Sequence, residues 1–256
     1  NISGQLGDGT HLSRSAPIRI GSDTNWITID AGASFSVGLK KDRSLWIWGD
    51  LFGQQAGTIS SIVSPRRVDR ANDWLSVSPG DQHVLALKTN NTLWTWGNNY
   101  FGQLGTGNNR PQISPFLIGR DNDWSGIAAG GGFSVAWKKN HSLWTWGDNF
   151  QGQLGIGYQP RQYKPIRLPG PPNWLQASVG FDHVIARRTD NSLWAWGNNE
   201  DGQRGDRSPG MALNPIPISQ HKDWEQVIAG ARHSLGIRSG LGFWAWGNND
   251  RGQLGD

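Results

Sequence analysis

Three histidines occupy one position of a repeated pattern, and histidine is the side chain that most often transfers protons or binds metal near neutral pH. They are His83, His183 and His233, and the same position in two further copies holds Phe35 and Phe133. Catalysis needs an asymmetric site, whereas these residues recur with the repeat. We therefore interpret the three histidines as structural residues that contact neighbouring backbone. The other histidines lack the spacing of metal ligands.

The remaining sequence contains no established catalytic motif. The chain has no cysteine, which excludes disulfides, thiolate zinc sites and cysteine nucleophiles. Its Gly-Gln-Leu-Gly runs lack the lysine and the following helix of a phosphate-binding loop, so we interpret them as turns. No Ser/His/Asp order, paired-carboxylate pattern or zincin motif stands out. The sequence therefore predicts a protein that is not an enzyme and has no cofactor or metal.

Tryptophan sets the repeat. The tripeptide Trp-x-Trp-Gly occurs five times, at steps of 48, 50, 50 and 50 residues. A fixed period near 50 residues indicates a repeat architecture. We interpret the paired tryptophans as packing between repeats rather than as sugar-binding platforms, because large aromatic side chains dominate the stability of such cores. The pairs are Trp46 and Trp48, Trp94 and Trp96, Trp144 and Trp146, Trp194 and Trp196, and Trp244 and Trp246.

Each repeat predicts four short strands. The first passes through a β-rich run such as residues 27–29, and the second through a run such as residues 35–39. The third holds Trp-x-Trp, whose alternation places both tryptophans on one face. Asn, Asp and Gly between the second and third strands predict tight hairpins. A proline-led run such as residues 17–20 suits an outer edge strand, where a missing N–H costs little.

Four antiparallel strands in every 50 residues predict an all-β fold, a β-propeller with four-stranded blades. Residues 1–256 are expected to form a single propeller domain. Its repeats span approximately residues 4–52, 53–101, 102–151, 152–201 and 202–251.

One run of residues resembles a known family. Leu-Trp-x-Trp-Gly-Asn-Asn-x-x-Gly-Gln-Leu-Gly, followed by proline and then Gly-x-x-His, is similar to the regulator of chromosome condensation repeat. Its clearest copies span residues 93–105, 143–155 and 243–255. This tryptophan-rich version looks more like bacterial members of the family than like the eukaryotic exchange factor. The resemblance implies a propeller, usually of seven blades.

The number of blades can be read in two ways. The last repeat lacks a proline-led strand, and residues 17–20 have no blade of their own, so we predict that they complete the last blade and close a five-bladed ring. However, residues 1–8 repeat residues 249–256, which favours a fragment of a longer, seven-bladed ring. We favour closure, since an open arc exposes two apolar blade faces.

The two faces of the propeller differ in their expected chemistry. Basic residues precede every hairpin on one face and could bind anions, although nearby aspartates offset them. The long loops on the opposite face place an aromatic arc beside an acidic one, a composition typical of protein interfaces. The candidate partner-binding residues are Leu51, Phe52, Tyr100, Phe101, Phe150, Glu200, Asp201 and Asp250.

These observations predict a non-enzymatic scaffold that binds a protein partner through its long loops. One alternative is a lectin-like propeller that binds carbohydrate. Another, by family analogy, is a guanine-nucleotide exchange factor or chromatin-binding regulator. A net charge of +4 with only 17% charged residues argues against nucleic acid. No apolar run is long enough to span a membrane. The sequence does not identify the compartment, and secretion or a place at the cell surface is compatible with it.

Overall fold

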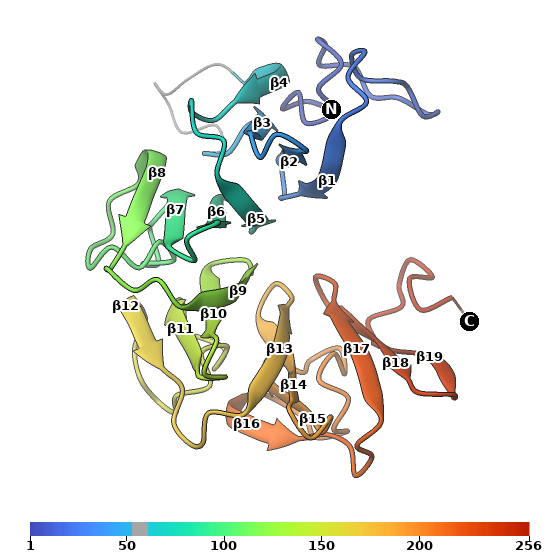
Figure 1. Cartoon of the computed structure of the whole chain (residues 1–256). Coiled ribbons are helices and arrows are strands. Elements are labelled where there is room, and N and C mark those ends of the chain that lie inside the picture. Colours follow the sequence, from blue (N-terminus) through green and yellow to red (C-terminus); the bar gives the residue numbers. More distant parts are fainter. Residues whose placement is uncertain (53–60, 256) are drawn as a thin grey trace.

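A computed structural model describes residues 1–52 and 61–255, which form five antiparallel sheets arranged as the blades of a five-bladed β-propeller (Figure 1). This part of the chain holds nineteen strands and no helix, so it contains no helix that could cross a membrane. The second Gly-Gln pair, Gly53-Gln54, lies outside the described residues.

The blades follow the repeat order of the sequence. Their strands, in chain order, are β1 (Trp26–Ala31), β2 (Phe35–Lys40), β3 (Leu45–Gly49) and β4 (Ile62–Arg67) in blade 1; β5 (Trp74–Pro79), β6 (His83–Lys88), β7 (Leu93–Gly97) and β8 (Gln112–Ile118) in blade 2; β9 (Trp124–Ala129), β10 (Phe133–Lys138), β11 (Leu143–Gly147) and β12 (Gln162–Arg167) in blade 3; β13 (Trp174–Val179), β14 (His183–Arg188), β15 (Leu193–Gly197) and β16 (Ala212–Pro217) in blade 4; and β17 (Trp224–Ala229), β18 (His233–Arg238) and β19 (Gly242–Gly247) in blade 5.

Blades 1 to 4 have four strands each, whereas blade 5 has three. Residues 17–20, which we predicted to complete blade 5, form no strand and do not pair with β19. The reason is that the segment before them is fixed on blade 1. Ser36 Oγ donates to the carbonyl oxygen of Gln5 over 2.9 Å, and Gly9 N donates to the carbonyl oxygen of Val63 over 2.8 Å. The strand pairing expected to close the ring is therefore not made.

Successive blades pack through two different faces. Trp74 and Trp96 of blade 2 lie in one buried cluster with Phe35, Val37 and Leu45 of blade 1. The same arrangement recurs between the later blades. At each of these four interfaces, the later blade contributes a tryptophan face and the earlier blade a face of Leu, Val, Ile and Phe side chains. Burial of these large side chains holds the propeller together.

The hairpin turns predicted from sequence are present between the second and third strands. Arg43, Asn91, His141 and Asn191 have positive φ angles of 60–63° there. The glycine after each Trp-x-Trp is also required. Gly147 has a φ of 101°, and a Cβ on it would lie 2.6 Å from the carbonyl oxygen of Gly132. Any larger residue would therefore clash with the backbone of the neighbouring strand.

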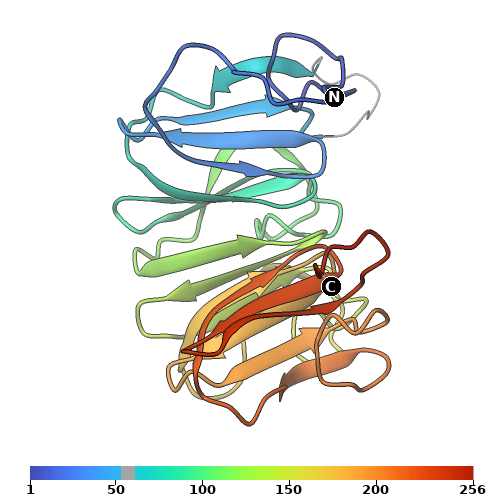
Figure 2. The same cartoon turned by 90° about the vertical axis from the view of Figure 1, so that its right-hand side faces the viewer.

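The innermost strands surround one axis. Figure 1 shows β1, β5, β9, β13 and β17 facing a common centre, with β1 and β17 at the two ends of the series. The ends of these strands line a central channel of about 450 Å³. Figure 2 shows that the N- and C-terminal segments lie at the same edge of the blades as the long loops between third and fourth strands.

Candidate protein-docking face

The loops between the third and fourth strands form what we call the loop face. Each described loop is fixed by side chains from its own sequence. In blade 2, Phe101 N donates to Gln103 Oε1 over 2.9 Å, and Leu104 N donates to Asn99 Oδ1 over 2.9 Å. The Asn99 amide in turn donates to the carbonyl oxygens of Asn108 and Arg110 over 2.8 and 3.0 Å. The loops are therefore held before any partner arrives, which lowers the ordering cost of binding.

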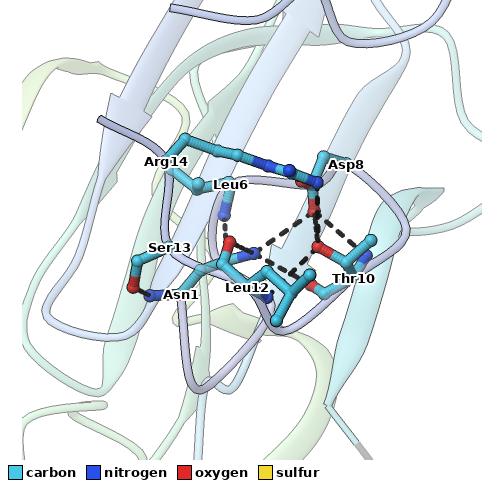
Figure 3. A network of polar contacts seen from close by, with 7 residues as sticks. All are labelled: Asn1, Leu6, Asp8, Thr10, Leu12, Ser13 and Arg14. Atoms are coloured by element: carbon cyan, nitrogen blue, oxygen red, sulfur yellow. Dashed lines mark hydrogen bonds and ion pairs between the residues drawn. The ribbon is translucent and has the colours of Figure 1, made fainter. Parts of the chain in front are cut away.

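The N-terminal segment, which precedes β1, forms a loop with the same kind of network. Figure 3 shows Asn1 at its centre, with Leu6 N donating to Asn1 Oδ1 over 2.8 Å and the Asn1 amide donating to the carbonyl oxygen of Thr10 over 2.9 Å. Arg14 Nε donates to Asp8 Oδ2 over 2.8 Å. Hydrogen bonds from Thr10 and Arg14 lower the pKa of Asp8 to about 2. Residues 1–14 thus reproduce the network that Asn99 organises in blade 2.

Several apolar side chains are left exposed by these fixed loops. Phe150 is 81% exposed and Tyr158 is 86% exposed, and Tyr100 and Met211 are exposed as well. Together with Arg161 they form what we call the aromatic patch. Exposed apolar groups of this kind, when clustered, mark interaction sites in soluble proteins.

A shallow depression lies within the patch. It has a volume of about 480 Å³ and is lined on its apolar side by Phe150, Tyr158, Pro160 and Met211. Arg161 also lines the depression. This volume is within the range that accommodates a few side chains of a bound segment.

Arg161 is held by the aromatic rings beside it. Its guanidinium carbon lies 5.1 Å from the ring centroid of Phe101 and 5.8 Å from that of Tyr100. The two rings meet edge to face, with centroids 5.0 Å apart. Within the described residues, Arg161 makes no ion pair. The patch therefore offers a positive charge next to aromatic surface.

Two of the candidate residues from the sequence lie elsewhere. Leu51 is buried in the cluster between blades 1 and 2, and Phe52 is half-buried against the same cluster. Leu51 is thus a core residue rather than a surface contact. The burial of Leu51 could not be predicted from the sequence of its own loop, because it depends on contacts with the neighbouring blade.

The other candidates are divided between the patch and a second region. Tyr100 and Phe150 lie in the patch, and Phe101 is its half-buried base, packed against Gly132. Glu200 and Asp250 are exposed on the loops of blades 4 and 5. Asp201 is engaged with Arg232, 3.5 Å away, and accepts a hydrogen bond from Asn248 over 3.1 Å.

Sequence reasoning missed the part played by Arg161. It precedes the outer strand β12, and it lies eight residues after the Gly-Gln pair of its own repeat. Its partners, Tyr100 and Phe101, belong to the loop of the preceding repeat. The sequence does contain a pattern that predicts this contact: two adjacent aromatic residues in one loop and a basic residue in the loop of the next repeat.

In each blade, one basic residue of the opposite face is held against tryptophan rings. Lys138 Nζ lies 4.9 and 5.2 Å from the ring centroids of Trp124 and Trp144, and within 2.9 Å of both Asp121 and Asp123. Burial favours a lower pKa for Lys138, but the hydrogen bonds to both aspartates outweigh it and raise the pKa. The equivalent cations in the other blades also lie over tryptophans: they are Lys40, Lys88, Arg188 and Arg238.

Two of the repeated histidines form buried hydrogen bonds across blade interfaces. His83 Nε2 lies 2.8 Å from Ser134 Oγ, and His183 Nε2 lies 3.0 Å from Ser234 Oγ. Burial lowers the pKa of each of these imidazoles to about 3. They are therefore neutral at pH 7. In the described part of the chain, no group of three His, Cys, Asp or Glu side chains is placed to hold a metal ion.

The comparisons with known proteins agree on the repeat. Models of the regulator of chromosome condensation (RCC1) repeat match residues 90–137, 140–187 and 190–237, and a second model of the repeat matches residues 74–103 and 174–203. These matches cover more than half of the chain. No curated protein sequence matches it.

Solved structures show the same fold. The chain is similar to Prp20p from Saccharomyces cerevisiae, with 22% identity, a TM-score of 0.79 and coverage of 90% of this chain. That structure is described with its binding properties to Gsp1p and histones, and another shows Kap60 bound to yeast RCC1 (Prp20). Human WBSCR16 gives 20% identity, a TM-score of 0.81 and coverage of 96% of this chain and 72% of that one. This chain spans 60% and 56% of the two Prp20p chains.

Proposed function

Because the chain belongs to the regulator of chromosome condensation repeat family, we propose that it is a non-enzymatic scaffold that binds a protein partner through the aromatic patch. One observation carries the proposal. Phe150 and Tyr158 are almost completely exposed. The loop that carries them is held by hydrogen bonds to the side chains of Asn149 and Gln153. A rigid platform of aromatic side chains around an arginine has the composition of an interaction hot spot.

The charge of the patch indicates the kind of segment that fits it. Arg161 lacks an ion-pair partner in the described structure and sits beside two aromatic rings. A carboxylate from the partner would pair with this guanidinium in a fork geometry. An apolar side chain next to that carboxylate would fill the depression between Phe150, Tyr158 and Met211. We therefore expect the partner to present an acidic residue beside an apolar one.

The printed partners of the structural neighbours support protein binding in general. Gsp1p, histones and Kap60 are proteins, and they are partners of Prp20p. A likeness at 22% identity shows the fold alone, so none of them is carried over to this chain as its partner. Carbohydrate binding, the alternative raised by exposed aromatics, has no specific support, because the exposed aromatic rings of the loop face gather in one patch instead of recurring in every blade.

The proposal is tested with two patch variants and one control. Phe150→Ala and Tyr158→Ala remove exposed rings, and Ile113→Ala removes an apolar side chain of similar exposure (73%) from the outer strand β8. Immobilised proteins capture partners from the source cells, and each candidate is then purified and its Kd measured by calorimetry. We expect the patch variants to weaken binding at least tenfold and the control to leave it unchanged. Equal affinity for all three variants would place the binding surface elsewhere.

A further inference from the structure

The depression in the aromatic patch is bordered by two opposite charges that do not pair with each other. Asp148 lines it as well as Arg161. Gly147 is the partner of Gln162 across β11 and β12, so Asp148 and Arg161 are the next residues beyond this pair on the two segments. Within the described residues, neither side chain makes an ion pair. A carboxylate and a guanidinium are therefore both available to a ligand.

The two charged groups are held by different parts of the molecule. The guanidinium carbon of Arg161 lies 5.1 Å from the centroid of the Phe101 ring, which belongs to blade 2. The carboxylate of Asp148 accepts a hydrogen bond from Gln153 Nε2 over 3.0 Å. Gln153 in turn contacts blade 4, because its carbonyl oxygen accepts a hydrogen bond from Trp196 Nε1 over 2.9 Å. The positive charge is thus tied toward blade 2 and the negative charge toward blade 4.

Apolar side chains provide much of the remaining lining. Phe150 and Tyr158 come from blade 3, and Met211 comes from the start of the outer strand of blade 4. All three side chains are exposed, so a ligand that covers them removes apolar surface from water. The depression therefore combines an apolar surface with one charge of each sign.

The negative charge is not needed to build the loop. Neutral residues take the place of Asp148 in three other blades, and these are Asn98, Asn198 and Asn248. Asn98 Oδ1 accepts a hydrogen bond from Gln103 Nε2 over 3.5 Å, which is the contact that Asp148 makes with Gln153. An amide can therefore supply the structural hydrogen bond, and the charge of Asp148 is additional.

The positive charge is not required by its position either. Arg161 directly precedes the outer strand of its blade. The same position holds uncharged residues in the other blades with an outer strand, and these are Ser61, Pro111 and Met211. Blade 3 thus differs from blades 1, 2 and 4 in placing a cation there. Both charges at the depression are compatible with the fold without being demanded by it.

We propose that the depression binds an extended segment of the protein partner in which an apolar residue stands between an acidic and a basic residue. Alternate side chains of an extended segment point to the same side, about 7 Å apart. The acidic side chain pairs with Arg161 and the basic side chain pairs with Asp148. The apolar side chain packs among Phe150, Tyr158 and Met211. This inference rests on the proposed function and adds to it the basic residue and the order of the charges.

The charges select the partner more than they strengthen its binding. Both ion pairs are exposed to water, so each changes the affinity by roughly threefold. The apolar contact supplies most of the affinity. A segment with its charges in the opposite direction would bring like charges together at both ends, and such contacts are unfavourable. The two charges therefore fix the direction in which the segment lies.

The first experiment selects ligands for the full chain from random heptapeptides displayed on phage. The unaltered chain should enrich peptides in which a basic and an acidic residue flank an apolar one. Peptides enriched by the Asp148→Asn variant should keep the acidic residue and lose the basic one. Peptides enriched by the Arg161→Met variant should keep the basic residue and lose the acidic one, because methionine is the residue of blade 4 at this position.

A double-mutant cycle then measures one ion pair directly. One enriched peptide is compared with a version that carries glutamine in place of its basic residue. By calorimetry, the unaltered chain should bind the original peptide about threefold more tightly than the glutamine version, and Asp148→Asn should bind both equally. A preference that Asp148→Asn retains would overturn the assignment of the basic residue to Asp148.

A matched control and a second variant separate the possible failures. Asp50 holds the position of Asp148 in blade 1 but lines a different depression, so Asp50→Asn should enrich the same peptides as the unaltered chain. The Tm of each variant shows whether it is folded. Enriched peptides that pair an acidic with an apolar residue and lack a basic one would overturn this inference and leave the proposed function standing. If Phe150→Ala selects the same peptides as the unaltered chain, or if the unaltered chain enriches none, the proposed function fails together with this inference.

Discussion

Lys138 and Arg161 both lie against aromatic rings, but the two cations have different surroundings. Lys138 lies over Trp124 and Trp144, is bonded to two aspartates and is nearly buried. Arg161 lies over Tyr100 and Phe101, has no ion pair among the described residues and lines an open depression. The cation is therefore neutralised and buried at Lys138, whereas at Arg161 it keeps a charge that we propose a protein partner recognises.

Removing a tryptophan from a blade interface should give the largest loss of stability. Trp146 is fully buried and its Nε1 donates to the carbonyl oxygen of Gln103 over 2.8 Å. Trp146→Ala should lower the free energy of unfolding by about 3–5 kcal/mol, because it leaves a cavity and a broken hydrogen bond. Chemical denaturation measures the change. Trp146→Phe, which keeps most of the volume, should lose less, and equal losses in both would assign the effect to the hydrogen bond.

Acid should lower the free energy of unfolding through the two buried histidines, His83 and His183. The pKa of His83 and that of His183 are lowered to about 3, so the folded state keeps both neutral while the unfolded state binds protons below its ordinary value of 6.5. Stability is complete above pH 6.5 and falls as the pH drops from 6.5 toward 3, by up to about 1.4 kcal/mol per pH unit for each histidine. Denaturation at several pH values measures this slope. Replacing His83 with Phe and Ser134 with Val together should reduce it.

A change at the buried cation should have a moderate effect. Lys138→Met keeps the length of the side chain but removes the charge from two aspartates and two indole rings. We expect a loss of about 1–2 kcal/mol in the free energy of unfolding. Lys41→Met, at an exposed lysine beside the equivalent cation of blade 1, is the matched control and should change stability little. An equal effect of both substitutions would refute the contrast between buried and surface cations.

The smallest effect on stability is expected at Arg161, the cation without an ion pair among the described residues. Arg161→Ala should change the free energy of unfolding by less than about 0.5 kcal/mol, since its rings stay in place without it. Its effect should appear as weaker affinity for the protein partner, measured by calorimetry, and Arg161→Lys should restore affinity only in part because lysine lacks the fork geometry. A large loss of stability in Arg161→Ala would make this residue part of the core and erase the difference between the two regions.

The propeller could be predicted from the sequence because its signals are local and repeated. Trp-x-Trp alternation, the hairpin at Asn91 and the glycine at 147 each act within one blade. Leu51 was assigned to the surface because its burial depends on contacts with blade 2. The prediction that residues 17–20 pair with the last blade was wrong, because hydrogen bonds hold the preceding loop on blade 1. Arg161 was missed because its partners belong to another repeat.

The residues at the start of each second strand have a consequence for how the chain folds. His83 and His183 are hydrogen-bonded to Ser134 and Ser234 of the next blade, whereas Phe35 and Phe133 share buried clusters with Val84 and Val184 of the next blade. The four interfaces between blades therefore alternate between a polar pair and an apolar pair. Near-identical repeats are prone to docking out of order while the chain collapses. If blade 2 were looped out, Phe35 would meet Ser134, and if blade 3 were looped out, His83 would meet Val184. Omitting blade 4 would set Phe133 against Ser234 in the same way. Every arrangement that skips one blade therefore contains a mismatch, so the order of the blades is checked as each one docks.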